Sequence, residues 1–202
     1  MNADEFGALL VLATAMSFTP GPNTTLSTAL AVNHGLRAAL PFCLAVPAGW
    51  SVLLLLCGGG VGALVMAVPA LRGALKVAGI GYLVWLAWRL WRAASLSQAA
   101  APVRVGFGQG VLLQFVNVKA WMLALTLSAG WIAVPGLDPA QATRRLALVL
   151  AVMAVYALVS NLTYAVAGAL LRGWLAQGRR LAWFNRGLAL LLAGTAAWMV
   201  PQ

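Results

Sequence analysis

The chain has 202 residues, of which 63% are hydrophobic and only 8% are charged. A soluble domain carries roughly 25% charged residues, so this composition excludes a soluble globular protein and predicts an integral membrane protein. The formal charge of +10 comes from residues that flank apolar segments, which indicates basic cytoplasmic loops rather than a nucleic-acid interface.

The first apolar segment runs from about Glu5 to Val32 and is interrupted in its middle by the run Thr19-Pro20-Gly21-Pro22-Asn23. Two prolines around a glycine remove helical N–H donors and loosen the backbone, so we expect the helix to break there. The alternative is a simple packing kink, but this motif opens more backbone than a kink requires.

The next two segments complete the first half of the chain. The second runs from about Leu36 to Val68 and contains the run Gly58–Gly60, and the third covers Pro69 to Trp91. A connector of small and polar residues, Ala93 to Arg104, then divides the chain into halves.

The fourth segment, Phe107 to Val134, contains a second interruption at Phe115-Val116-Asn117-Val118-Lys119. Lys119 lies about twelve residues into this segment, a depth of ~18 Å at 1.5 Å per residue. A lysine near the interface snorkels to the headgroups, but this depth favours a functional role inside the membrane.

The remaining chain adds a loop at Pro135–Pro139, a fifth segment from about Ala142 to Leu175 and a sixth from Leu181 to Val200. We therefore predict an all-α, polytopic membrane protein with six spans in a single transmembrane domain, residues 1–202. Three spans per half give two inverted repeats, about residues 1–92 and 105–202, each with a broken first helix.

Charge sets the predicted orientation. Eight of the 13 lysines and arginines fall on one side, four on the other, and Lys119 lies within the membrane. All three acidic residues fall on the side with four. The positive-inside rule then predicts that both termini lie outside the cytoplasmic membrane.

Paired breaks in matching positions predict a substrate site at the bilayer midplane. A broken helix leaves free amides at one end and free carbonyls at the other, which together suit the carboxylate and ammonium of a zwitterion. The candidate substrate-binding residues at the breaks are Thr19, Pro20, Gly21, Pro22, Asn23, Gln114, Asn117 and Lys119. Tyr82 and Asn161 are weaker candidates, because helix–helix hydrogen bonding also explains polar residues at such places.

These same residues carry a resemblance. The intact Thr-Pro-Gly-Pro-Asn motif and Asn117-Val118-Lys119 resemble the signatures of the LysE/RhtB family of bacterial amino-acid exporters, as does the stretch Lys76–Leu83. Val118 stands where that family has proline, which predicts a milder second break or one that depends on Asn117 alone. The resemblance implies export driven by the proton-motive force from the bacterial inner membrane.

The sequence thus predicts a secondary exporter of amino acids or related small metabolites that works by alternating access, with membrane lipid as its surroundings. It predicts no enzyme activity, cofactor or metal, since one histidine cannot supply a metalloprotease cluster. It leaves the oligomeric state open, a homodimer included. The alternative function is a transmembrane thiol-redox protein, for which Cys43 and Cys57 are poorly placed: they lie ~21 Å apart on one predicted helix.

Overall fold

The computed structural model describes residues 1–93, 105–177 and 179–200, and these form helices and no strands. The predicted connector, from residue 94 on, lies outside the described residues. In chain order the helices are α1 (Ala3–Phe18), α2 (Pro22–His34), α3 (Leu36–Gly58), α4 (Val61–Ala67), α5 (Pro69–Arg92), α7 (Phe107–Val116), α8 (Val118–Leu127), the π-helical turn η1 (Ser128–Ile132), α9 (Pro139–Leu175) and α10 (Arg180–Met199).

The predicted break in the first segment is confirmed. Helix α1 ends at Phe18, and Thr19 is extended, with φ −67° and ψ 128°. Pro22 is the first residue of α2, where its fixed φ suits a helix and its missing N–H costs no hydrogen bond. The TPGPN motif therefore divides the segment into two helices.

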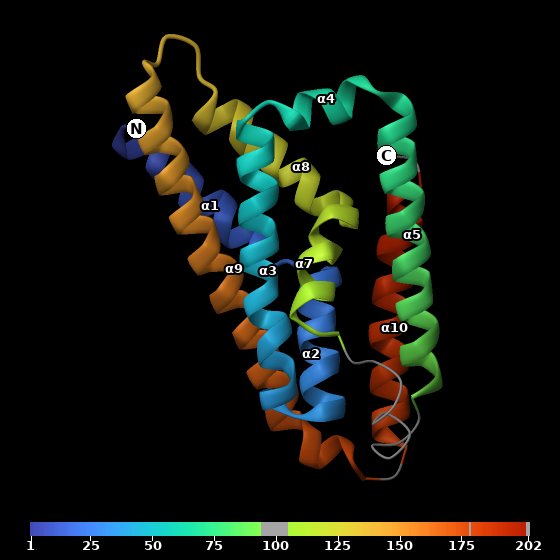
Figure 1. The fold of residues 1–202 in the computed structure, drawn as a ribbon. Coiled ribbons are helices and arrows are strands. Elements are labelled where there is room, and N and C mark those ends of the chain that lie inside the picture. Colours follow the sequence, from blue (N-terminus) through green and yellow to red (C-terminus); the bar gives the residue numbers. More distant parts are fainter. Residues whose placement is uncertain (94–104, 178, 201–202) are drawn as a thin grey trace.

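The second segment differs from its prediction, which extended one helix to Val68. Helix α3 ends at Gly58, and Gly60 has a φ of +92°, a left-handed conformation that glycine adopts without a steric penalty. The chain turns there, and α4 lies across one end of the molecule instead of lengthening α3 (Figure 1). Helix α5 then matches the predicted third segment to within a residue.

The predicted break at Asn117 is also confirmed. Asn117 lies between α7 and α8 with non-helical φ −87° and ψ 99°. The two parts of the fourth segment are bent by 70°. The break is therefore sharp although Val118 replaces a proline.

The fifth segment begins earlier than predicted. Asp138 caps α9 by accepting a hydrogen bond of 2.8 Å from the Gln141 backbone amide, and Pro139 occupies the first helical position. A side-chain cap followed by proline is a strong helix start, which explains why the helix includes residues assigned to the loop.

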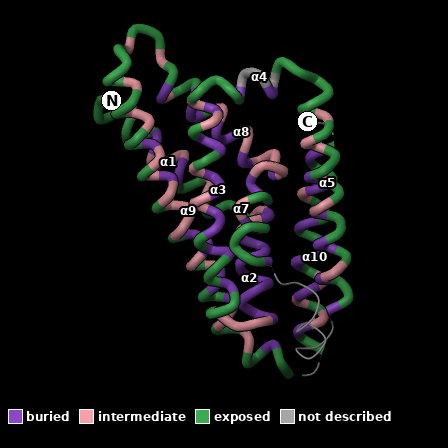
Figure 2. Tube along the Cα trace, in the orientation of Figure 1, coloured by how far each residue is buried: buried purple, intermediate pink, exposed green. Residues whose placement is uncertain are grey.

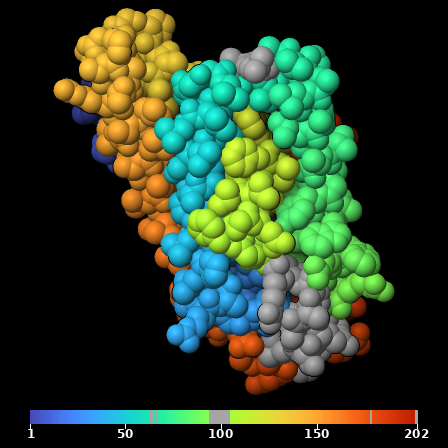
Figure 3. Space-filling view, viewed as in Figure 1, coloured from blue at the N-terminus to red at the C-terminus, as the bar shows by residue number. Residues whose placement is uncertain are grey.

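Packing places α2 at the centre. Almost the whole of α2 is buried, including its polar residues Thr24, Thr25, Ser27, Thr28 and Asn33 (Figure 2). It packs on α3 and most extensively on α9. Helix α7 fills the seam between α3 and α5 (Figure 3), and α5 pairs with α10.

Three described helices, α3, α5 and α9, are long and apolar enough to cross a membrane, and the bent segment made by α7, α8 and η1 raises the number to four. Large apolar side chains such as Val11, Val77, Leu112 and Leu170 lie exposed on the outer faces, as lipid contact requires. The start of α1 and the end of α10 lie toward the same end of the molecule (Figure 1).

Candidate functional site

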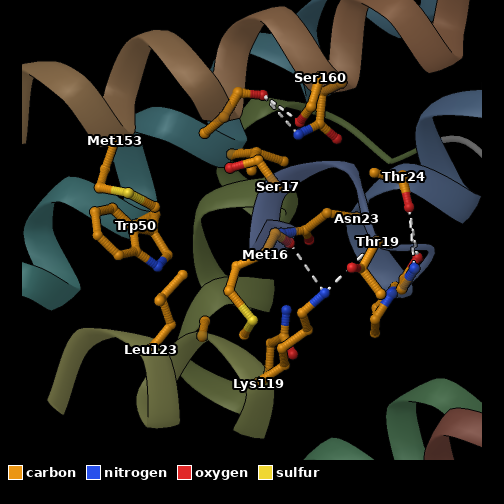
Figure 4. A pocket seen from close by; sticks show the side chains of 17 residues that line it. Met16, Ser17, Thr19, Asn23, Thr24, Trp50, Lys119, Leu123, Met153 and Ser160 are labelled. Carbon is orange, nitrogen blue, oxygen red and sulfur yellow. Dashed lines mark hydrogen bonds between the residues drawn. The ribbon is translucent and has the colours of Figure 1, made fainter. Parts of the chain in front are cut away.

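A cavity of about 70 Å³ lies where the two breaks meet. The end of α1, the start of α2, and residues of α3, α8 and α9 line it (Figure 4). It occupies the boundary between the two large hydrophobic clusters of the protein: Val46 belongs to one, and Trp50, Leu123 and Met153 belong to the other. Segments about 100 residues apart in sequence thus enclose one small cavity that has both polar and apolar side chains in its wall.

Lys119 caps the carbonyl end of α1. Its Nζ donates hydrogen bonds to the backbone oxygens of Met16, at 3.1 Å, and Thr19, at 3.4 Å. The last carbonyls of a helix lack intrahelical partners and carry partial negative charge, so an ammonium group is stabilised there. The described residues that line the cavity include no acid, and Lys119 is the one charged side chain among them.

The amide end of α2 lies beside this lysine. A methyl group built on Gly21 would lie 3.6 Å from the Lys119 Nζ, an ordinary van der Waals distance, so the lysine packs directly beside the start of α2. Thr24 caps the helix start, because its Oγ1 accepts a hydrogen bond of 3.0 Å from the Gly21 amide. The site therefore offers a carbonyl end, an amide end and a cationic side chain within one cavity.

Asn23 is held in place by Gln114. Their side-chain amides exchange two hydrogen bonds, at 2.9 and 3.2 Å, and Gln114 also donates to the Gly110 carbonyl at 3.0 Å. Gln114 is fully buried and does not line the cavity. It was predicted to bind substrate, but its place behind Asn23 fits a positioning role.

Asn117 differs from the other polar groups at the site. It is 5% exposed and lines the cavity, yet its Oδ1 has no hydrogen-bond partner among the described residues. A buried acceptor without a partner costs about 1–3 kcal/mol, so this oxygen is suited to accept a hydrogen bond from a bound molecule.

The structure gathers most of the predicted residues around this cavity. Those that line it are Thr19, Gly21, Pro22, Asn23, Asn117, Lys119 and Asn161. The amide of Asn161 is already engaged, accepting from Ser27 at 2.7 Å and donating to Ala157 at 2.8 Å. Tyr82 lies elsewhere, in a separate cavity of about 340 Å³ between α5 and α7, so it is not part of this site.

Pro20 lines a different space, an apolar crevice of about 640 Å³ beside α8 and α10. The crevice and the central cavity share five residues in their walls: Met16, Thr19, Gly21, Pro22 and Lys119. Lys119 therefore stands at the junction of the two spaces.

The sequence did not single out Trp50, Met16 or Met153 as site residues, although all three line the cavity. Each is an apolar residue in an apolar helix, and nothing in the local sequence distinguishes the face turned to a cavity from the face turned to a neighbouring helix. Ser160 also lines the cavity and could have been found from the polar run Ser160–Tyr164.

The two cysteines do not form a redox site. Both are unpaired and buried on α3. The Cys43 Sγ contacts the Ser27 Oγ at 3.8 Å and the Asn161 carbonyl at 3.6 Å, and neither cysteine lines the central cavity. The geometry gives no support to thiol exchange across the membrane.

A helical membrane protein with a polar cavity between two broken segments belongs to the class of transporters. The family model described as LysE type translocator matches residues 14–201, so the chain belongs to this family. It is a transporter and not an enzyme.

Two relatives are informative. The chain is 34% identical over 177 residues to the "Cysteine/O-acetylserine efflux protein" of Salmonella typhimurium (strain LT2), covering 87% of each chain. It is 33% identical over 182 residues to the protein of the same name from Escherichia coli (strain K12), covering 90% of this chain and 89% of the relative. No solved structure gives a significant match. The family and the efflux relatives support an amino-acid exporter, and the apolar helices agree with a multi-pass protein of the inner membrane.

Proposed function

We propose that this protein is a secondary exporter of small, neutral amino acids and that the central cavity is its substrate site. The observation that carries the proposal is the position of Lys119, whose Nζ caps the Met16 and Thr19 carbonyls inside the cavity formed by the two breaks. A cation at this depth is costly unless it serves binding. The efflux relatives are named for cysteine, which is a small neutral amino acid, and for O-acetylserine, which carries a longer, uncharged side chain.

The cavity offers a partner for each charge of a zwitterion. The substrate carboxylate binds the Lys119 Nζ and the free amides at the start of α2, where the helix dipole is positive. The substrate ammonium takes the Asn117 Oδ1 and the carbonyls of Met16 and Thr19, which Lys119 releases as it turns to the carboxylate. The hydrogen bonds between Lys119 and the α1 carbonyls are thus replaced by hydrogen bonds to the substrate. These new bonds limit the free-energy cost of removing the substrate charges from water.

The repeats supply a mechanism of alternating access. In this proposal one repeat consists of α1, α2, α3 and α5, the other consists of α7, α8, α9 and α10, and the two rock against each other about the cavity. The packing between the two repeats is unequal, which supports the proposed rocking motion. Helix α7 packs on α5, whereas α1 has no comparable packing with α10. The 640 Å³ crevice lies on the side of α10 and is separated from the cavity by shared wall residues that include Lys119, so in this proposal movement of these residues opens the cavity on that side.

In this proposal the proton-motive force drives export. Both termini of the protein lie on the outer side of the cytoplasmic membrane. Lys119 is the one charged group that lines the cavity, so coupling acts through its protonation or through the membrane potential on the charge of the substrate. Glu5, near the start of α1, pairs with Arg145, near the start of α9, at 3.0 Å, which agrees with an aqueous surface at these helix starts.

The test is efflux of radiolabelled serine and cysteine from preloaded cells and from proteoliposomes. We expect Lys119→Met to lower the efflux rate at least ~30-fold, the loss that follows from removing one partner of a buried charged contact. Lys119→Arg, which keeps the charge, should retain part of the activity.

The matched control is Lys76→Met, since Lys76 is the other lysine of the chain and its Nζ binds the Val200 carbonyl, away from the cavity. Thermal unfolding in detergent checks that all variants fold. Normal efflux in a folded Lys119→Met protein would refute the proposal.

A further inference from the structure

One side of the central cavity is an apolar wall. Figure 4 shows Trp50, Leu123 and Met153 together on one side, across the cavity from Asn23 and Thr24. The three side chains come from three helices, α3, α8 and α9, and are at most 8% exposed. Because they belong to one packed cluster, they form a rigid boundary that a larger substrate cannot push aside without disrupting the core.

Trp50 also brings a polar group to this wall. Its indole nitrogen lies on the edge of the ring that faces the interior of the cavity (Figure 4). Among the residues that the structure describes, this N–H makes no hydrogen bond, and the nitrogen is not one of the enclosed unpartnered atoms, although the residue as a whole is only 5% exposed. An indole N–H that opens into a cavity without an acceptor from the protein can donate to a bound molecule.

The cavity is small in relation to amino acids. The observed volume of about 70 Å³ is several times the roughly 10–15 Å³ that a single water requires, so the cavity suits a small solute. Alanine, serine and cysteine have six or seven non-hydrogen atoms, whereas leucine has nine and phenylalanine has twelve, so the first three suit a small cavity better.

We infer that Trp50 determines substrate specificity. Together with Met153, its ring limits the bulk of the substrate side chain, and its N–H selects side chains that carry a hydrogen-bond acceptor. This inference rests on the proposed function and assigns the selectivity of the same site. The charged groups of the substrate bind at the breaks, and the side chain then points to the opposite wall. The choice between substrates therefore depends on residues that do not contact the ammonium and carboxylate groups of the substrate.

The size limit is tested by efflux of five preloaded amino acids: alanine, serine, 2-aminobutyrate, leucine and phenylalanine. The wild-type protein should export serine at least ~10-fold faster than leucine, which is the discrimination that a hydrophobic pocket gives for extra methylenes. Trp50→Ala and Met153→Ala should each reduce this ratio severalfold by raising leucine export. Using two variants keeps the test valid if one of them fails to fold.

The donor is tested separately with Trp50→Phe, which keeps an aromatic ring and removes the N–H. Serine and 2-aminobutyrate have the same number of non-hydrogen atoms and differ in a hydroxyl against a methyl group. We expect Trp50→Phe to lower the serine-to-2-aminobutyrate export ratio about 2- to 10-fold, the value of one hydrogen bond. The control is Trp88→Phe, because Trp88 lies exposed on α5 and lines no part of the cavity.

The outcomes separate this inference from the proposed function. If the wild-type protein exports none of the five amino acids, both fail. If it exports serine but the ratios stay unchanged in folded Trp50→Ala, Met153→Ala and Trp50→Phe proteins, the inference about Trp50 is wrong and the exporter remains. If the wild-type protein exports leucine as fast as serine, the proposed size limit is wrong, and the proposed export function is unaffected.

Discussion

The side-chain amides of Asn23 and Gln114 exchange two hydrogen bonds and so join the two broken segments beside the cavity. Replacing Gln114 by leucine leaves the partly buried amide of Asn23 without its partner. We therefore expect Gln114→Leu to lower the free energy of unfolding by ~1–3 kcal/mol and to slow export, because Asn23 loses its fixed orientation. Thermal unfolding in detergent and serine efflux are the measurements.

A double-mutant cycle with Asn23→Leu and Gln114→Leu isolates this pair. The double variant should be more stable than the sum of the two single losses predicts, since neither amide is then left unpaired. Strictly additive losses would show that the two amides do not depend on each other.

A second prediction concerns the contact between α5 and α7. A methyl group built on Gly79 would lie 2.1 Å from the backbone oxygen of Val116, whereas one on Gly81 would meet nothing within 4 Å. We expect Gly79→Ala to force the two helices apart at a cost of ~1–3 kcal/mol. Gly81→Ala, on the same helix, should be neutral or stabilising by up to ~1 kcal/mol. Equal unfolding temperatures for the two variants would contradict the observed close approach.

The second break allows a test of its own. Asn117 is extended, and Val118 is the first residue of α8, a position where proline fits because its N–H is not needed. We expect Val118→Pro to keep the fold. It should raise the free energy of unfolding by ~0.4–1 kcal/mol, because proline reduces the number of conformations open to the unfolded chain. Leu112→Pro, inside α7, should instead cost ~3 kcal/mol. Circular dichroism melts of both variants give the comparison, and a collapse of the Val118→Pro protein would place the helix start elsewhere.

A fourth prediction addresses the thiol-redox alternative. The variant Cys43→Ala/Cys57→Ala loses both sulfurs but no residue that lines the cavity. It should export serine at a rate close to that of the wild-type protein, with a stability loss of ~1 kcal/mol for each buried sulfur. Efflux measured with and without a thiol-blocking reagent checks this. Complete loss of export in a folded variant would give the cysteines a role that their positions do not suggest.

The sequence was sufficient for the features that depend on local chemistry. The prolines and glycine of TPGPN cannot continue a helix, so the first break follows from the covalent structure of the backbone. The break at Asn117 likewise follows from residue type, since a polar residue interrupts an apolar segment there. For the same reason the residues at the breaks were found before the fold was known.

Only the tertiary structure decided which of these residues share a space. Gln114 and Tyr82 are polar residues in apolar helices, yet the first lies behind the cavity and the second lies in another one. Trp50 and Met153 became part of the site because α3 and α9 turn those faces toward the breaks. The rotation of a helix about its axis is set by packing against helices distant in the sequence, and with apolar residues on every face the local sequence does not encode it.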